Sequence, residues 1–512
     1  MNPLFRRKSL EDCALDIAER GGLKRTLNKW HLTALGVGAT IGAGIFATTG
    51  TAIVGDPARP GAGPAIVLSF ILTAVACGFA ALCYAEFAAM VPISGSAYTY
   101  AYASLGEFVA WIIGWDLIIE YAVGNIGVAI GWSGYFVELV SHFGLSIPSW
   151  LATDPRSAAM AAHAVAAGTS DPNTLYLASA LTTAPHLLGV PLIANLPAFL
   201  SVAVITVLLV IGIKESADTN NAMVLLKVGI ILFFIAVGVF LIRPHNWTDP
   251  AQGGFAPNGF KGISAAAAII FFSYIGFDAV STASEEAKNP AKDMPFGIIM
   301  SLVVCTVLYI ALSIVMTGMA PWKSLGTPEP MITALAQANG PPGLIGFSRL
   351  IVSLGAVIAM GSVLLVFQLG QPRIFFSMAR DGLLPPFIAK VHPRFKTPHV
   401  GTILTGIFVA VFAAFANISE VVDLTNIGTL FAFVLVSLGV IVLRWQEPER
   451  VRPFKVAGVP FTPLISVAAC LYLMIELPRV TWIRFGLWLL AGLTIYFLYS
   501  IRHSRLRARY KA

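Results

Sequence analysis

Long apolar runs recur along almost the whole chain, and they constrain its fold more than any other feature. A helix needs about 20 mostly apolar residues to cross a bilayer. The runs are continuous rather than alternating, so they predict helices and not the strands of a membrane barrel. The sequence therefore predicts an all-α membrane protein with twelve transmembrane helices, at residues 31–55, 65–91, 105–140, 194–213, 221–242, 262–283, 296–320, 346–370, 400–416, 423–443, 461–478 and 483–501.

The composition agrees with this class and argues against others. Of 512 residues, 57% are hydrophobic and 12% are charged, whereas a soluble globular protein carries about 25% charged residues. We therefore expect the lipid bilayer as its surroundings. The net charge of +7 comes from basic residues between apolar runs, so we expect no nucleic-acid partner. The sequence contains no metal-ligand spacing, nucleophile elbow or phosphate loop, so we expect no enzyme, no metal and no cofactor.

The basic residues also predict an orientation. With the N-terminus inside, 24 of the 33 Lys and Arg residues fall in cytoplasmic segments and eight on the opposite side, and Lys227 remains within a span. Cytoplasmic loops carry the excess of Lys and Arg. We therefore expect a cell membrane protein, in a plasma or inner membrane, with both termini cytoplasmic. The long loop 141–193 then lies outside, and we expect it to be irregular or weakly helical.

Glycines interrupt the first and the sixth predicted spans. Glycine costs about 1 kcal/mol in a helix interior, and open backbone at membrane depth is tolerated only where it is buried in protein or lines a cavity. Freed amides attract a carboxylate, and freed carbonyls attract an ammonium group, so two such breaks suit an α-amino acid. The alternative is close helix packing through small residues. The segments concerned are TIGAG at 40–44 and FSYIG at 272–276.

The two interrupted spans are five spans apart, which predicts two inverted five-helix repeats, spans 1–5 and 6–10, followed by two added helices. The expected organisation is a cytoplasmic tail, a first repeat containing the external loop 141–193, a second repeat, two further spans and a basic tail. Their respective ranges are 1–30, 31–243, 262–444, 461–501 and 502–512.

Several ordered motifs resemble those of the cationic amino acid transporter family, in particular its bacterial members, within the amino acid–polyamine–organocation superfamily. They are GLKRTL at 22–27, GVGATIGAGIF at 36–46, YAEF at 84–87, PISGSAY at 92–98, IGFD at 275–278, EEAKNP at 285–290, QPR at 371–373 and MARDGLLP at 378–385. The resemblance spans most of the chain. It implies the two-repeat fold and a substrate site at the interrupted spans.

The resemblance also implies which backbone groups meet the substrate. The carboxylate would meet the amides of Ala43 and Gly44, next to Gly42. The amino group would meet carbonyls of the two breaks, at Thr40, Ile41, Phe272, Ser273 and Ile275.

Among the ionisable residues inside predicted spans, where a charge costs about 2.5–3.5 kcal/mol, three are candidate site residues. Lys227 in span five either snorkels to the cytoplasmic interface or acts in coupling. The resemblance favours coupling, because proton-coupled members carry a lysine there against the unwound part of span one. Glu120 is a candidate pocket residue and Asp278 a candidate coupling residue, and the alternative for each is a structural hydrogen bond between helices.

Phe367 is the last candidate site residue. It falls where the resemblance places the lining of the side-chain pocket, and a phenylalanine there leaves room for small side chains only. The sequence therefore predicts proton-coupled symport of small neutral L-amino acids, alanine-like in size. A cationic amino acid carrier, an amino acid exchanger and a membrane amino acid sensor remain alternatives. A small membrane protein partner also remains open.

Overall fold

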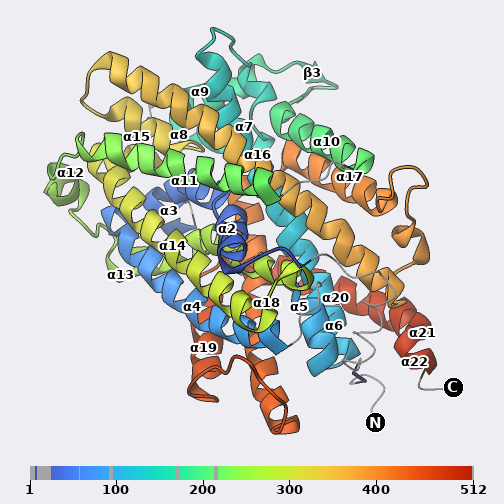
Figure 1. Cartoon of the computed structure of the whole chain (residues 1–512). Helices are drawn as coiled ribbons and strands as arrows, with labels where there is room; N and C mark the ends of the chain where they lie inside the picture. Colours follow the sequence, from blue (N-terminus) through green and yellow to red (C-terminus); the bar gives the residue numbers. More distant parts are fainter. Residues whose placement is uncertain are drawn as a thin grey trace.

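The computed structural model describes residues 6–7, 25–56, 58–90, 96–168, 172–212 and 217–509, and most of them are helical (Figure 1). Most of the predicted tail 1–30 lies outside these ranges, as do Lys214, residues 92–95 of one motif and the last three residues of the basic tail. Within the described part, every strand is only two residues long.

The first predicted span is broken as the glycines indicated. Asn28 caps α2 (Lys29–Thr40) by accepting hydrogen bonds from two backbone amides in its first turn. The chain then turns at Ile41, where ψ is 97°, passes through the π-helical turn Gly44–Thr48 and enters α3 (Thr49–Val54). The axes of these two halves differ by 40°.

The rest of the first half supplies long helices around this break. Glu107–Ser141 runs as one helix of 35 residues, with a π-helical turn at Ile119–Val123 between its two halves. The elements are α4 (Ile66–Met90), α5 (Ser96–Ser104), α6 (Glu107–Ile118), α7 (Gly124–Ser141), α10 (Leu196–Ile211) and α11 (Ala217–Val239).

The second half begins with another interruption. Helix α13 (Gly259–Ile270) continues as a 3₁₀ turn at Phe271–Tyr274, and a second 3₁₀ segment runs over Phe277–Glu286. The helices that follow are α14 (Pro290–Met319), α15 (Pro330–Gln337), α16 (Pro342–Arg380), α17 (His399–Phe415), α18 (Ile418–Gln446), α19 (Phe461–Ile475), α20 (Arg479–Ile495), α21 (Ile501–His503) and α22 (Arg505–Arg509).

Among the described residues, eight helices are long and apolar enough to cross a membrane, or nine if the bent pair counts as one span. Three shorter apolar helices, α10, α17 and α19, coincide with the remaining predicted spans. The all-α membrane fold is thus confirmed. The count of twelve stays a prediction.

The loop 141–193 is more regular than the sequence analysis expected. It forms α8 (Pro155–Ala166) and α9 (Pro172–Thr183), which precede a hairpin of β3 (His186–Leu187) and β4 (Val190–Pro191). Asp154 caps α8 by accepting from the amides of Arg156 and Ser157. A second hairpin, β1 (Gly55–Asp56) with β2 (Arg59–Pro60), follows α3. A short helix, α12 (His245–Thr248), follows α11.

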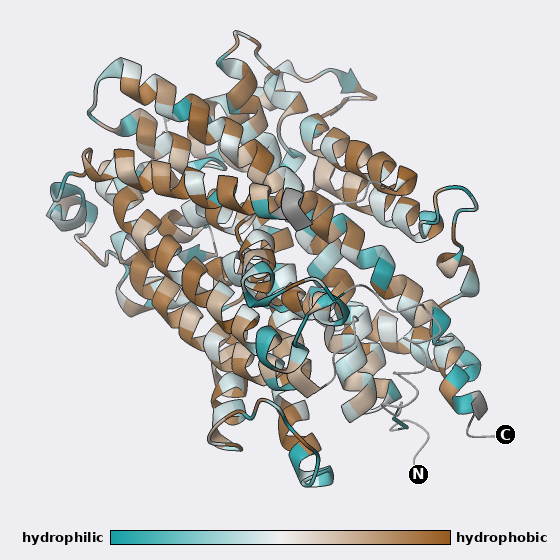
Figure 2. Ribbon diagram, viewed as in Figure 1, coloured by the Kyte–Doolittle hydropathy of each residue, from teal (hydrophilic) through white to brown (hydrophobic). Residues whose placement is uncertain are grey.

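The bundle has two distinct ends (Figure 1). We call the end that carries α8, α9 and α15 the loop end, and the end that carries α21 and α22 the tail end. Helix α14 packs against α2 and α4, and α16 packs against α7. Hydrophobic residues cover much of the outward helix surface (Figure 2), including Leu225 and Phe240, which are 74% and 89% exposed. This apolar surface is what lipid requires.

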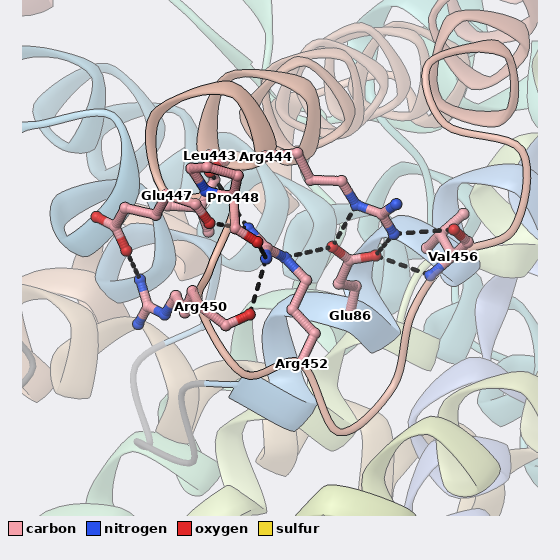
Figure 3. Close-up of polar contacts among 8 residues, drawn as sticks. All are labelled: Glu86, Leu443, Arg444, Glu447, Pro448, Arg450, Arg452 and Val456. Atoms are coloured by element: carbon pink, nitrogen blue, oxygen red, sulfur yellow. Dashed lines mark hydrogen bonds and ion pairs between the residues drawn. The ribbon is translucent and has the colours of Figure 1, made fainter.

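A buried ion network ties α4 to the α18–α19 connection (Figure 3). Arg444 donates from Nε and Nη2 to the two carboxylate oxygens of Glu86, at 3.0 and 2.6 Å. The amide of Val456 also donates to Glu86, at 2.8 Å, and Nε of Arg452 lies 3.5 Å from the same carboxylate. Glu86 is only 1% exposed, so these donors compensate a charge that is almost fully withdrawn from water.

Candidate functional site

The two helix breaks lie directly against each other. A Cβ built on Gly44 would stand 2.3 Å from Cα of Ser273, and one built on Gly276 would stand 2.8 Å from the carbonyl of Ala39. Gly276 also has φ of +119°, a conformation that a residue with a Cβ rarely adopts. The glycines are therefore needed for the contact of one break with the other.

The first break places backbone amides and carbonyls next to the second break. The π-helical turn begins at Gly44 after Ala43, and the first amides of a helix have no acceptor within it. The hydroxyls of Thr48 and Thr49 donate hydrogen bonds to the Gly44 carbonyl, at 2.7 and 3.2 Å. Upstream, the Thr40 carbonyl accepts from the hydroxyl of Tyr309 at 3.1 Å. Tyr309 was missed by the sequence analysis.

The second break is held by Asp278. The chain is extended at Ile275, with φ −62° and ψ 132°, and the amide of Gly276 donates to Oδ1 of Asp278 at 3.3 Å. Asp278 is fully buried. Its other oxygen and the hydroxyl of Ser273 are buried, and neither has a hydrogen-bond partner among the described residues, so the break keeps polar atoms that a ligand could satisfy.

Lys227 reaches from α11 to the first break. Its Nζ donates to the carbonyl of Gly38 at 2.6 Å, near the end of α2, and the residue is 2% exposed. This geometry differs from the snorkelling alternative, in which the ammonium group would turn to the membrane surface. The structure thus brings this predicted coupling residue to the predicted substrate site.

Glu120 lies in the π-helical turn of the third span, and such turns occur often at functional sites. Its carboxyl group lies close to the carboxyl group of Asp278 and to the hydroxyl of Thr429 on α18. Asp116 lies one turn earlier and is 1% exposed, while Glu120 is 3% exposed. Three buried carboxyl groups therefore gather beside the second break.

Phe367 fills space next to the same part of α7. Its ring centroid is 5.6 Å from that of Tyr121, and a Cβ on Gly124 would lie 3.5 Å from its ring. One turn before it on α16, Val363 lies 3.1 Å from where a Cβ of Gly42 would stand. The Phe367 side chain, 4% exposed, is thus one helical turn from the first break.

A small hollow, partly open to the surroundings, lies between the C-terminal half of the first span and the start of α18. An ion pair forms part of its lining: Nη2 of Arg59 lies 2.8 Å from Asp56 and 2.9 Å from Asp423. Arg59 is 7% exposed, and within the part of the chain that the structure describes its Nε and Nη1 have no hydrogen-bond partner. The hollow is lined by Thr48, Thr51, Arg59, Ile269, Ile418, Ser419, Val422 and Asp423.

Comparison with known proteins decides the family. Residues 27–498 match the model of the amino acid permease family. The chain belongs to this family. The permease is 46% identical to a branched-chain amino acid permease of Bacillus subtilis over 504 residues, which cover 98% of this chain and 99% of the relative.

Two further relatives extend the comparison. A methylthioribose transporter of Bacillus subtilis is also 46% identical, over 506 residues that cover 99% of the permease and 100% of the relative. A vacuolar cationic amino acid transporter of Arabidopsis thaliana is 36% identical over 456 residues, covering 88% of this chain and 68% of the relative. The permease is thus a multi-pass membrane transporter and not an enzyme, as the sequence analysis predicted.

Proposed function

We propose that this permease is a secondary active transporter that carries small neutral L-amino acids, alanine-like in size, together with a proton. The observation that supports this most is the contact between the two helix breaks, Gly44 against Ser273 and Gly276 against Ala39. Paired breaks offer amides and carbonyls to opposite ends of a zwitterion near the middle of the membrane. Alternating access then exposes this site to one side at a time.

In this proposal the substrate is held by backbone groups. Its carboxylate binds the amides of Ala43 and Gly44, where the partial positive charge of a helical N-terminus favours an anion. Its ammonium group binds carbonyls at the end of α2 and in the second break. The Thr40 carbonyl already accepts from Tyr309, so substrate binding at that carbonyl must share or displace this hydroxyl.

Proton coupling is assigned to Lys227. The charged ammonium group donates to Gly38 at 2.6 Å, and loss of its proton weakens this link between α11 and α2. A proton shifts the equilibrium between the outward-facing and inward-facing conformations only if the two conformations bind it with different affinities. A contact of Lys227 with Gly38 that forms in only one conformation provides this difference in affinity. Asp278 is the second coupling residue, because its carboxylate holds the amide of Gly276.

Substrate size is assigned to Phe367, which occupies space beside Tyr121 and Gly124. The phenylalanine argues against long cationic side chains. The relative named as a branched-chain amino acid permease supports neutral, apolar substrates and makes valine and leucine the next candidates after alanine.

The proposal places the permease in a cell membrane with its tail end in the cytoplasm, following the distribution of basic residues. The proton is then the coupling ion, and no organic cofactor takes part. The loop end faces outward and receives the substrate.

Uptake into proteoliposomes tests the proposal. Purified permease should accumulate labelled alanine when the lumen is alkaline and contains no amino acid. An exchanger would need amino acid inside, and a sensor would bind alanine without accumulating it. Either of these two results would overturn the proposed symport.

A second candidate substrate is an uncharged thiosugar, because the methylthioribose transporter is 46% identical to the permease. Such a ligand has no carboxylate for the amides at Gly44. Competition separates the two: excess methylthioribose should leave alanine uptake unchanged, whereas strong inhibition by it with no effect of alanine would favour the thiosugar.

A further inference from the structure

The β3–β4 hairpin carries an apolar tip that the rest of the described chain leaves uncovered. Leu187, Leu188 and Val190 are 61%, 97% and 63% exposed, and Leu192 directly after the hairpin is 48% exposed. Figure 1 shows the hairpin projecting from the loop end near the start of α10. Single exposed apolar residues are common, but a contiguous group marks an interaction surface.

The turn at the tip has an unusual composition for a water-exposed hairpin. Its two central residues, Leu188 and Gly189, have φ of +52° and +80°. Turns with two positive φ values favour Asn-Gly or Asp-Gly, whose first residue is polar and tolerates this conformation. A leucine gains nothing for this backbone conformation, and its side chain is almost fully exposed, which favours an apolar environment around the tip.

Helix α10, which follows the hairpin, is too short to match the bilayer. Its 16 residues give a length of about 24 Å at 1.5 Å per residue, while the hydrocarbon layer is about 30 Å thick. The helix cannot lengthen at the loop end, because Asn195 caps it and donates its own amide to Ala414 at 2.8 Å. Apolar surface is therefore missing at this point of the bundle.

The outward face of α10 identifies its neighbour as lipid. Leu196, Leu200, Val204, Val207 and Ile211 repeat every three or four residues, and each is 40–57% exposed. Such spacing places them along one face of the helix. This stripe ends at Leu196, four residues after Leu192 and the hairpin, so the apolar surface continues from the helix into the hairpin.

We propose that the β3–β4 hairpin inserts its tip into the bilayer leaflet at the loop end, at the boundary between headgroups and acyl chains, beside the start of α10. Interfacial segments bury apolar side chains about 5–10 Å deep at this boundary. A two-residue hairpin leaves backbone groups that need water, which keeps the tip at the boundary and out of the hydrocarbon centre.

The insertion gives the loop 141–193 a role. The loop is attached to α18 through the ion pair of Arg156 with Glu420, and Asn417 donates to Ser157 at 3.0 Å. The same helix carries Asp423, which pairs with Arg59. The loop packs on the start of α18, and the inserted hairpin thereby anchors this loop to the lipid.

A fluorescent probe tests the insertion. Cys77, Cys83, Cys305 and Cys470 are buried, so a Cys13→Ser background allows selective labelling of Leu188→Cys with an environment-sensitive dye in nanodiscs that hold one chain. The matched control is Ala167→Cys, an exposed residue at the end of α8. We expect the dye at position 188 to be quenched by nitroxide-labelled lipid and protected from iodide, and the dye at position 167 to behave in the opposite way.

The proposal is overturned if iodide quenches position 188 as strongly as position 167 while nitroxide lipid does not. It is equally overturned if position 188 is protected from both quenchers in nanodiscs, since a protein contact would then cover the tip. A Leu188→Asp variant that retains wild-type alanine uptake would show that the fold survives. This variant, labelled at Val190→Cys, should lose protection from iodide.

Discussion

At the scale of single residues, Lys227 has the most specific environment. A buried ammonium group must find acceptors or lose its proton, and Lys227 finds the Gly38 carbonyl in the last turn of α2, just before the first break. The residue was recognisable from sequence as a charge within a span. Its partner was not, because Gly38 lies 189 positions away and its carbonyl is indistinguishable in sequence from any other.

Replacing Lys227 by glutamine tests its coupling role. Glutamine can still donate a hydrogen bond to Gly38 but cannot gain or lose a proton at neutral pH. We expect Lys227→Gln to lose alanine accumulation driven by a pH gradient and to retain exchange of internal for external alanine. Wild-type accumulation by the variant under a pH gradient would refute proton coupling at this residue.

Phe367 is expected to set substrate size. Phe367→Ser removes the ring that packs on Tyr121 and opens the space beside α7. Longer amino acids should then compete with alanine uptake about tenfold better, equivalent to about 1.4 kcal/mol. Inhibition constants for leucine and arginine against alanine uptake measure this change. If both constants stay the same in the variant, Phe367 does not line the side-chain pocket.

Glu329, between α14 and α15, is expected to make stability depend on pH. Burial, followed by the nearby Glu138 carboxylate, raises the pKa of Glu329 from 4.5 to about 7. A raised acid pKa means that the folded state binds the proton more tightly, so stability falls as pH rises from about 4.5 through 7. Melting temperatures at pH 5.5 and 8 should differ less in Glu329→Gln than in the wild type, whereas Glu449→Gln, at an exposed site, should leave the difference unchanged.

At the scale of elements, the breaks were predictable and their surroundings were less so. Gly42, Gly44 and Gly276 indicated the interruptions, since glycine at those positions disfavours a helix interior. The helix α8 also had a local signal that the sequence analysis passed over, namely Asp154 followed by Pro155, a cap residue and a proline at the first helical position. The ion pair of Arg59 with Asp423 had no local sequence signal, because it depends on the approach of α18 to β2.

The link between α4 and the α18–α19 connection carries a prediction of its own. Glu86→Gln removes the carboxylate that receives Arg444, Arg452 and the amide of Val456. Removing one partner of a buried ion pair costs about 3–5 kcal/mol, and we expect the lower end because the Arg444 side chain is 24% exposed. Thermal unfolding in detergent measures the loss, and stability equal to that of Glu449→Gln would contradict it.

At the scale of the whole molecule, the all-α membrane class followed from the apolar runs alone. The number of spans did not follow from the apolar runs, because α10, α17 and α19 have only 16, 17 and 15 residues. Helices of this length either cross a locally thin bilayer or end within its hydrocarbon layer. A short helix needs help from its neighbours to satisfy the bilayer. For α10 the hairpin before it supplies apolar surface, a relation that hydropathy along the chain does not express.

The central claim is that the contact between the two breaks forms the amino acid site, and binding of labelled alanine to purified Gly44→Ala tests it most directly. A Cβ at this position would collide with Ser273 at 2.3 Å, whereas Gly78→Ala is a matched control because a Cβ there meets nothing within 4 Å. Gly78→Ala should bind alanine like the wild type, and Gly44→Ala, while still folded by its melting temperature, should lose saturable binding. Wild-type affinity in Gly44→Ala would contradict the account.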